Sequence, residues 1–257
     1  RMREIESGRC HASESVPLRA LRLGMVELDS ALPDGGLRRG AVHEWIGVTD
    51  CHGQIGTPTR CRPRSGRDPD WSPPLALLAH LARQAAAGDS TDGYARAPGR
   101  LVWIGERVWP YPHVMGRDRS LLAESLWVRT GSDGSRLWAT ELALRSGAAA
   151  AVIADGSRFD RAATQRLQLA AEAKGGVCLL VRPPHERSML SAAATRWWVR
   201  TATSSGTGPR WTVELLRCKG VQPAPGAVRP WMVGYEWQSG DLRVFPDVVG
   251  GSGTETD

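Results

Sequence analysis

Short apolar runs alternate with helical patterns through the middle of the chain. The stretches 150–154 (AAVIA) and 177–181 (VCLLV) are continuously apolar, and each is followed by a polar or helix-breaking residue. Between them, 159–174 is rich in Ala, Leu, Gln and Arg and ends at two glycines, which is typical of a helix. Strands that are apolar along their whole length and alternate with helices indicate a parallel sheet buried on both faces.

The same patterns predict further elements on either side of this region. The apolar spacing predicts strands at 41–46, 101–104, 126–128, 197–203 and 211–216, and helices at 26–32, 75–88, 135–145 and 188–194. The last two strands flank a turn-forming stretch of Ser, Gly, Thr and Pro, so we expect an antiparallel hairpin there. The predicted fold class is α/β, a mostly parallel sheet flanked by helices with an antiparallel hairpin at its edge.

Composition divides the chain into three regions. Residues 1–20 are polar and of mixed charge, and the chain ends in GGSGTETD, so we expect a flexible N-terminal segment at 1–20 and a flexible tail at 241–257. The stretch between them, 21–240, is long enough for one domain with a substantial core. Within it, 47–72 is rich in Gly, Pro and Arg, which predicts a long loop after the first strand.

Cysteine spacing and apolar content exclude several classes of protein. The five cysteines of the 257-residue chain include no CxxC pair, so neither a disulfide framework nor a zinc site is indicated, and we expect no metal. No stretch approaches the roughly 20 apolar residues that cross a bilayer, and the N-terminal residues lack the apolar core of a secretory signal. We therefore expect a cytoplasmic protein that does not act on membranes.

Lysine is nearly absent, which restricts phosphate chemistry. The 33 Lys and Arg residues contribute to a formal net charge of +6, but only Lys174 and Lys219 are lysines. A functional phosphate loop combines glycines, a lysine that reaches the phosphate oxygens, and a Ser or Thr whose hydroxyl holds Mg²⁺. Any lysine in such a role would have to be one of these two, because the planar guanidinium of Arg is a poor substitute.

The segment after the first predicted strand has the glycines of a phosphate loop but not its lysine. Ligands of open α/β sheets bind at the carboxyl ends of the strands, so this segment is the first place to look. Gly47, Gly53 and Gly56 are present, but Gln54 or Thr57 stands where the lysine would follow. We interpret the segment as a degenerate nucleotide site and expect neither a cofactor nor ATPase activity.

A pattern at 28–47 resembles a known superfamily. It reads LDxxLPxGGLxxGxxxEWxG and looks like the opening of the RecA/RadA recombinases. The segments 101–112, 138–155, 166–184 and 211–220 are similar to the ImuA family, the RecA-like accessory proteins of bacterial damage-induced mutagenesis. The resemblance implies a RecA-like fold. It also implies an ImuB-like Y-family protein and a DnaE-type polymerase as partners, with RecA as a further candidate.

Two carboxylates follow predicted strands at the places where RecA-like ATPases use them. Glu106 occupies the position of a water-activating carboxylate, and Asp155 ends a strand as a Mg²⁺-holding carboxylate does. Because the lysine is missing, we expect structural roles for both. Asp155 is then interpreted as the cap of the following helix, and Glu106 as one member of a solvated loop pair with Arg107.

The predicted hairpin carries candidate contact residues. Trp197 and Trp198 are adjacent on an alternating strand, so one indole must face away from the core and is a candidate partner contact. Arg217 and Lys219 end the second strand, where RecA-family proteins place basic residues that reach a neighbouring subunit. Such cations also protect exposed sheet edges, and the sequence leaves both interpretations open.

Together, these features favour a non-catalytic RecA-like adaptor in damage-induced error-prone DNA synthesis, acting through protein contacts. The alternative is an ATP-dependent recombinase or recombination regulator of the RecA/RadA type. Direct DNA binding has weaker support, because the net charge is spread along the chain without a dense basic stripe. Nucleotide binding separates the two hypotheses.

Overall fold

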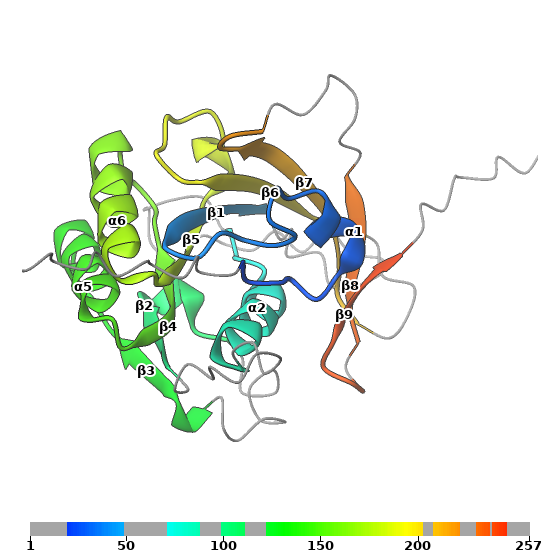
Figure 1. Cartoon of the computed structure of the whole chain (residues 1–257), viewed down its shortest axis with the longest axis horizontal. Helices are drawn as coiled ribbons and strands as arrows, with labels where there is room; N and C mark the ends of the chain where they lie inside the picture. Colours follow the sequence, from blue (N-terminus) through cyan, green and yellow to red (C-terminus); the bar gives the residue numbers. More distant parts are fainter. Residues whose placement is uncertain are drawn as a thin grey trace, which may run out of the picture.

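One mixed β-sheet organises the part of the chain that the computed structural model describes, residues 20–48, 71–87, 99–110, 122–202, 208–221, 230–236 and 238–245. The strand order is β3-β2-β4-β5-β1-β6-β7-β8-β9 (Figure 1). The strands are β1 (Ala41–Val48), β2 (Arg100–Ile104), β3 (Ser125–Val128), β4 (Ala149–Asp155), β5 (Val177–Arg182), β6 (Thr195–Ala202), β7 (Arg210–Cys218), β8 (Trp231–Tyr235) and β9 (Leu242–Phe245). Strands β1 to β6 pair in parallel, and β7, β8 and β9 extend the sheet by antiparallel pairing.

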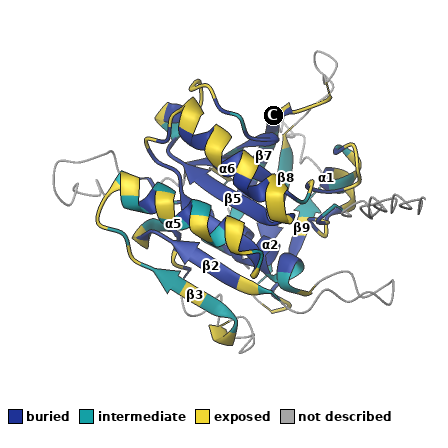
Figure 2. Ribbon diagram, turned by 60° about the vertical axis from the view of Figure 1, so that its left-hand side comes forward, coloured by how far each residue is buried: buried dark blue, intermediate teal, exposed yellow. Residues whose placement is uncertain are grey.

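Helices cover both faces of the parallel region. The α-helices are α1 (Val26–Ser30), α2 (Leu75–Ala87), α5 (Asp133–Ser146) and α6 (Arg161–Lys174), and two 3₁₀ turns, η2 (Glu106–Val108) and η3 (Pro184–Glu186), follow β2 and β5. Helices α5 and α6 lie side by side over one face of the sheet, with their outer surfaces exposed (Figure 2). Helix α2 packs against the other face, where it forms a second core with the sheet. This arrangement explains why β4 and β5 are buried along their whole length.

Local sequence signals set the limits of the two long surface helices. Ser132 caps the first turn of α5 by accepting a hydrogen bond from the Ser135 amide, and Asp160 does the same for α6 through the Ala163 amide. Helix α6 ends at Gly175, whose φ of 71° is left-handed and favours glycine. Buried Gln168 then ties α6 to the sheet, because its side-chain oxygen accepts a hydrogen bond from the Val42 amide at 3.0 Å.

Tryptophan stacking joins the neighbouring parallel strands β1 and β6. Trp45 on β1 and Trp197 on β6 are both fully buried, and their rings stack 5.3 Å apart with an interplanar angle of 5°. Beside them, burial lowers the pKa of His43 to about 4, so its ring is neutral at neutral pH. The His43 Nδ1 lies 2.8 Å from the Thr195 hydroxyl oxygen, which also accepts a hydrogen bond from the Trp197 indole. This buried polar group is therefore satisfied within the core.

The predicted fold class is confirmed, with two corrections. The antiparallel part has two more strands than the predicted hairpin, because β8 and β9 continue it. The predicted tail at 241–257 therefore begins too early, since β9 pairs with β8 and places Leu242 in the core. The N-terminal residues 1–19 and most of the predicted loop, 49–70, lie outside the described residues.

The predicted helix at 188–194 is wrong. After η3 and the hydrogen-bonded turn at 187–188, the chain has no helix before β6. Its polar groups are used in other contacts, because the Ser191 hydroxyl donates to buried Glu44 and the Ala192 amide donates to the Thr164 hydroxyl on α6. The apolar spacing that suggested a helix instead reflects a connector that packs against the sheet and α6. In the described parts of the chain, no helix has the length and hydropathy to cross a bilayer.

Candidate functional site

The carboxyl ends of the central parallel strands meet at one edge of the sheet, which is where a RecA-like fold would hold a nucleotide. Gly47 lies at the end of β1, and a Cβ atom placed there would be 3.1 Å from Pro74 Cδ, so the chain that leads into α2 crosses closely over this strand end. Gly53, Gln54, Gly56 and Thr57 lie outside the described residues. The neighbouring strand ends therefore define the geometry of the edge.

The ends of β2 and β4 approach each other closely at Gly105. Its φ of 96° is one that L side chains rarely adopt, and a Cβ atom there would be 3.0 Å from Asp155 Cβ. This contact brings the segment 105–107 beside Asp155, as the sequence predicts from two strand ends at one edge. The site residues Glu106 and Asp155 are thus neighbours in space, although nearly 50 residues separate them along the chain.

Both carboxylates at this edge contact arginines of the same chain. Glu106 forms an exposed ion pair with Arg129, which follows β3, with 2.5 Å between Arg129 Nε and Glu106 Oε1. Arg107 Nε lies 3.9 Å from Asp155 Oδ2. The predicted Glu106–Arg107 pair is therefore wrong, because Arg107 turns toward Asp155 and Arg129 reaches Glu106 instead.

Asp155 also forms hydrogen bonds within the turn that follows β4. Its Oδ1 accepts hydrogen bonds from the Ser157 amide at 2.9 Å and from the Ser157 hydroxyl at 2.5 Å. The predicted capping role is wrong, because the N-cap of α6 is Asp160. Asp155 instead closes a tight polar turn directly after β4, and its side chain is almost fully buried.

Further arginines complete the surroundings of this turn. Arg136 on α5 donates to the Ser157 carbonyl at 2.7 Å, and its guanidinium lies over the Phe159 ring. A hydrogen bond from Arg158 holds the pKa of Asp133 below its usual range against the opposing effect of burial, with a further contribution from Arg136.

Among the described residues, no three His, Cys, Asp or Glu side chains are grouped so as to hold a metal ion.

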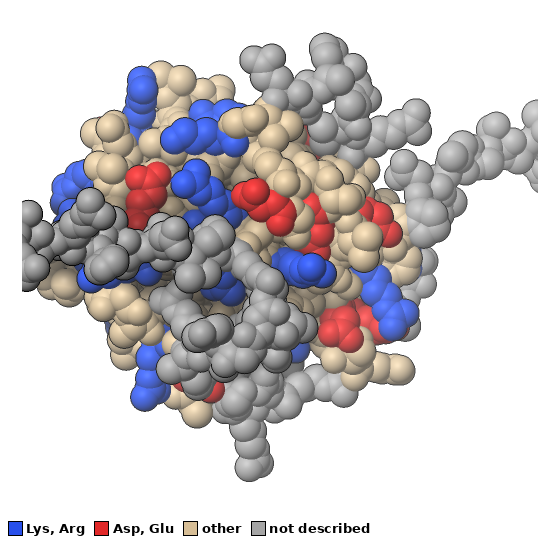
Figure 3. All heavy atoms as spheres, viewed as in Figure 1, with Lys and Arg blue, Asp and Glu red and all other residues tan. Residues whose placement is uncertain are grey.

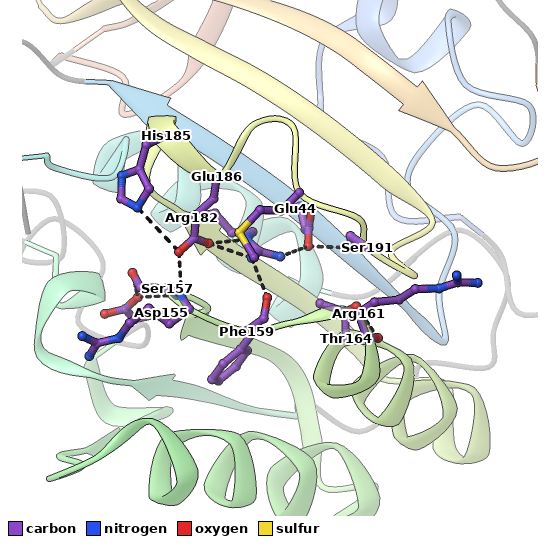
Figure 4. Close-up of polar contacts among 12 residues, drawn as sticks. Glu44, Asp155, Ser157, Phe159, Arg161, Thr164, Arg182, His185, Glu186 and Ser191 are labelled. Carbon is purple, nitrogen blue, oxygen red and sulfur yellow. Dashed lines mark hydrogen bonds and ion pairs between the residues drawn. The ribbon is translucent and has the colours of Figure 1, made fainter.

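A second polar cluster, buried beneath the connector between β5 and β6, was not predicted (Figure 4). Glu44 on β1 is fully buried and accepts hydrogen bonds from Arg182 Nη1 at 2.9 Å, Arg196 Nε at 2.6 Å and the Ser191 hydroxyl at 2.6 Å. Glu186 accepts a further hydrogen bond from Arg182, whose Nε lies 2.8 Å from the Glu186 carboxylate. We call these five residues the buried ion cluster.

The buried ion cluster has its charges matched. Burial alone would lower the pKa of Arg182, but the carboxylates of Glu44 and Glu186 outweigh that effect and raise it. Arg182 also donates to the Phe159 carbonyl at 2.6 Å, which ties the end of β5 to the turn after β4. Such a cluster holds β1, β5, β6 and their connector in one arrangement and leaves little capacity for proton transfer.

The sequence signal for this cluster is a carboxylate in a mostly apolar strand. In the run AVHEWIGV, strand alternation puts Glu44 on the same face as Val42, toward α6. A charge at such a position requires buried partners. Their identity depends on the strand order β5-β1-β6, which the sequence does not reveal.

The hairpin residues lie in two different environments. Trp197 is buried in the tryptophan stack, so it is not available as a partner contact, whereas Trp198 faces outward, half-buried under the Arg187 guanidinium. Arg217 and Lys219 lie where β7 meets the first residues of β6, at the amino ends of the parallel strands. The structure therefore places them at the edge opposite Glu106 and Asp155.

Comparison with known proteins agrees with this arrangement. The chain is 31% identical over 229 residues to Protein ImuA of Caulobacter vibrioides strain NA1000. The aligned region covers 82% of this chain and 84% of that protein. The chain belongs to the ImuA family. Protein ImuA from a second strain of the same species, ATCC 19089, matches to the same extent, and no family model matches. Membership of the ImuA family supports the RecA-like interpretation of the sheet and involvement in damage-induced mutagenesis.

Proposed function

We propose that this ImuA-family protein is a non-catalytic RecA-like adaptor in damage-induced, error-prone DNA synthesis. The observation that carries the proposal is that both carboxylates at the carboxyl-end edge of the sheet are bonded to residues of the same chain. Asp155 is bonded to Ser157 and faces Arg107, and Glu106 is paired with Arg129. Nucleotide hydrolysis requires carboxylates that are available to hold Mg²⁺ or to orient water, and these two already have partners within the chain.

The position of the lysines supports the same proposal. Lys174 is the last residue of α6, just before β5 begins, and Lys219 follows β7 beside the start of β6. Both lysines of the chain therefore lie at the amino ends of the parallel strands, whereas Glu106 and Asp155 lie at the carboxyl ends. Neither is placed to neutralise the β- and γ-phosphates of a nucleotide bound at the carboxyl-end edge.

The charges visible in Figure 3 favour protein partners over nucleic acid. Among the described residues on this face, basic and acidic side chains are interspersed and form no continuous basic stripe. Strong electrostatic binding to nucleic acid relies on such a stripe. We therefore propose that the adaptor contacts an ImuB-like Y-family protein and a DnaE-type polymerase, the partners that resemblance to the ImuA family implies.

A genetic complementation experiment tests this function. Deleting the gene is expected to reduce the damage-induced mutation frequency of the host toward the uninduced level, and the full chain should restore it. Glu106→Gln should restore it equally well, because the Glu106–Arg129 pair is exposed and serves no chemistry. A deletion without effect, or a Glu106→Gln chain that accumulates normally but does not restore mutation, would contradict the proposal.

A further inference from the structure

A groove of about 870 Å³ runs between α6, the connector before β6 and the turn that follows β7. It runs along α6 from Arg161, the first residue of that helix, to the turn after β7, which lies at the amino ends of the parallel strands. Arg217 and Lys219, the two basic residues that the sequence suggests as contacts, both line it. We call it the α6 groove.

Large apolar side chains are exposed in the α6 groove. Leu169 on α6 is 57% exposed, Leu190 in the connector is 71% exposed, and Val221 in the turn is 36% exposed. They come from three segments far apart in sequence, yet all three line the same groove. An isolated exposed leucine needs no explanation, but apolar side chains that converge on one concave surface mark an interaction site.

The charges around these apolar side chains are mostly positive. Arg161, Arg217 and Lys219 line the α6 groove, against the single carboxylate of Glu172. Glu172 accepts a hydrogen bond from the Gln168 amide at 2.9 Å, and Arg217 donates to the backbone carbonyls of Ser191 and Ala193. Among the described residues, no carboxylate forms an ion pair with any of the three cations. The described lining therefore carries more basic than acidic side chains beside an apolar surface.

The backbone that shapes the α6 groove is held in place by hydrogen bonds. The Lys219 amide donates to the Ala194 carbonyl at 2.7 Å, and the Val221 amide donates to the Cys218 carbonyl at 3.2 Å. These bonds fix the turn after β7 against the connector. A site whose walls are already ordered binds with a smaller loss of conformational entropy than a site that forms on binding.

We propose that the α6 groove binds a peptide segment of a partner protein that presents large apolar side chains next to Asp or Glu. This inference rests on the proposed adaptor function and specifies the chemistry of the docked segment. The apolar residues supply a surface for leucine-sized side chains, and the three cations select for acidic neighbours. None of the described residues that line the groove is aromatic, so this lining lacks the stacking surface that single-stranded nucleic acid uses, and a peptide is the better match.

Selection from a phage-displayed library of random 16-residue peptides on the purified full chain tests the proposal. Enriched peptides are expected to combine at least two large apolar residues with a net negative charge. In fluorescence polarisation with the synthesised peptides, Leu190→Asp and Lys219→Glu should each weaken binding about tenfold or more. Leu142→Asp, at an exposed leucine on the outer face of α5, is the matched control and should leave the affinity unchanged. Thermal unfolding of each variant verifies that the fold is intact.

Other outcomes overturn the proposal. These are the absence of enriched peptides, enrichment of peptides without acidic residues, and equal binding to the Leu190→Asp chain. If light scattering shows a dimer that Leu190→Asp dissociates, the occupant is a second copy of the chain. If a labelled oligothymidine loses affinity in the same variants, the ligand is a nucleic acid. If a Leu190→Asp chain no longer binds peptide but still restores damage-induced mutation, the adaptor does not act through the α6 groove, whereas failure of the unmodified chain to restore it would refute the adaptor function.

Discussion

Replacing Glu44 with glutamine is expected to lower the free energy of unfolding by about 3–5 kcal/mol, because breaking a fully buried ion pair leaves an uncompensated charge. Glutamine has nearly the same shape, so the change removes charge without creating a cavity. It leaves Arg182 and Arg196 with Glu186 as the remaining carboxylate of the buried ion cluster. Urea denaturation followed by tryptophan fluorescence measures the effect, since the indoles of Trp45 and Trp197 lie in the adjacent core.

Glu106→Gln provides the matched control for this measurement. It removes the same type of charge from an exposed pair with Arg129, and exposed pairs contribute about 1 kcal/mol or less. A Glu44→Gln chain whose unfolding free energy equals that of Glu106→Gln would show that the buried ion cluster does not hold β1, β5 and β6 together.

Replacing Trp197 with alanine is expected to lower the free energy of unfolding by about 3–5 kcal/mol, the usual cost of removing a large aromatic side chain from a packed core. The change removes the ring stacked on Trp45 and in contact with Trp231. Trp198→Ala, one residue further along β6, should cost about 1 kcal/mol or less, because that indole faces outward beneath Arg187. Thermal and urea unfolding of the two variants give the comparison. A larger loss for Trp198→Ala would contradict the orientation of β6.

The strand and helix positions of the parallel region could be predicted because each element carries a local signal. Continuous apolar runs mark β4 and β5, and the glycines at 175 and 176 mark the end of α6, whereas its N-cap, Asp160, was not predicted. Strands β8 and β9 carry weaker signals. They are short, and β8 contains Gly234, so their assignment depends on pairing with β7 rather than on their own sequence.

The candidate site could be predicted in position but not in partners. Glu106 and Asp155 each follow a strand, and strand ends of a parallel sheet meet at one edge, so their proximity follows from the pattern. Their partners come from elsewhere, since Arg129 follows β3 and reaches Glu106 only because β3 lies beside β2. The same limit applies to Trp197 and Trp198, because alternation shows that one faces the core but not which one. The stack on Trp45 decides it, and that contact depends on β1 lying next to β6.

Calorimetric titration of the purified full chain with MgATP tests the central claim most directly. An adaptor whose edge carboxylates are paired with arginines, and whose lysines lie at the opposite edge, should show no saturable binding up to millimolar nucleotide. Saturable binding with micromolar affinity, lost on replacing Asp155 with asparagine in a chain that remains folded, would show that the edge is a working nucleotide site. That result would contradict the non-catalytic account.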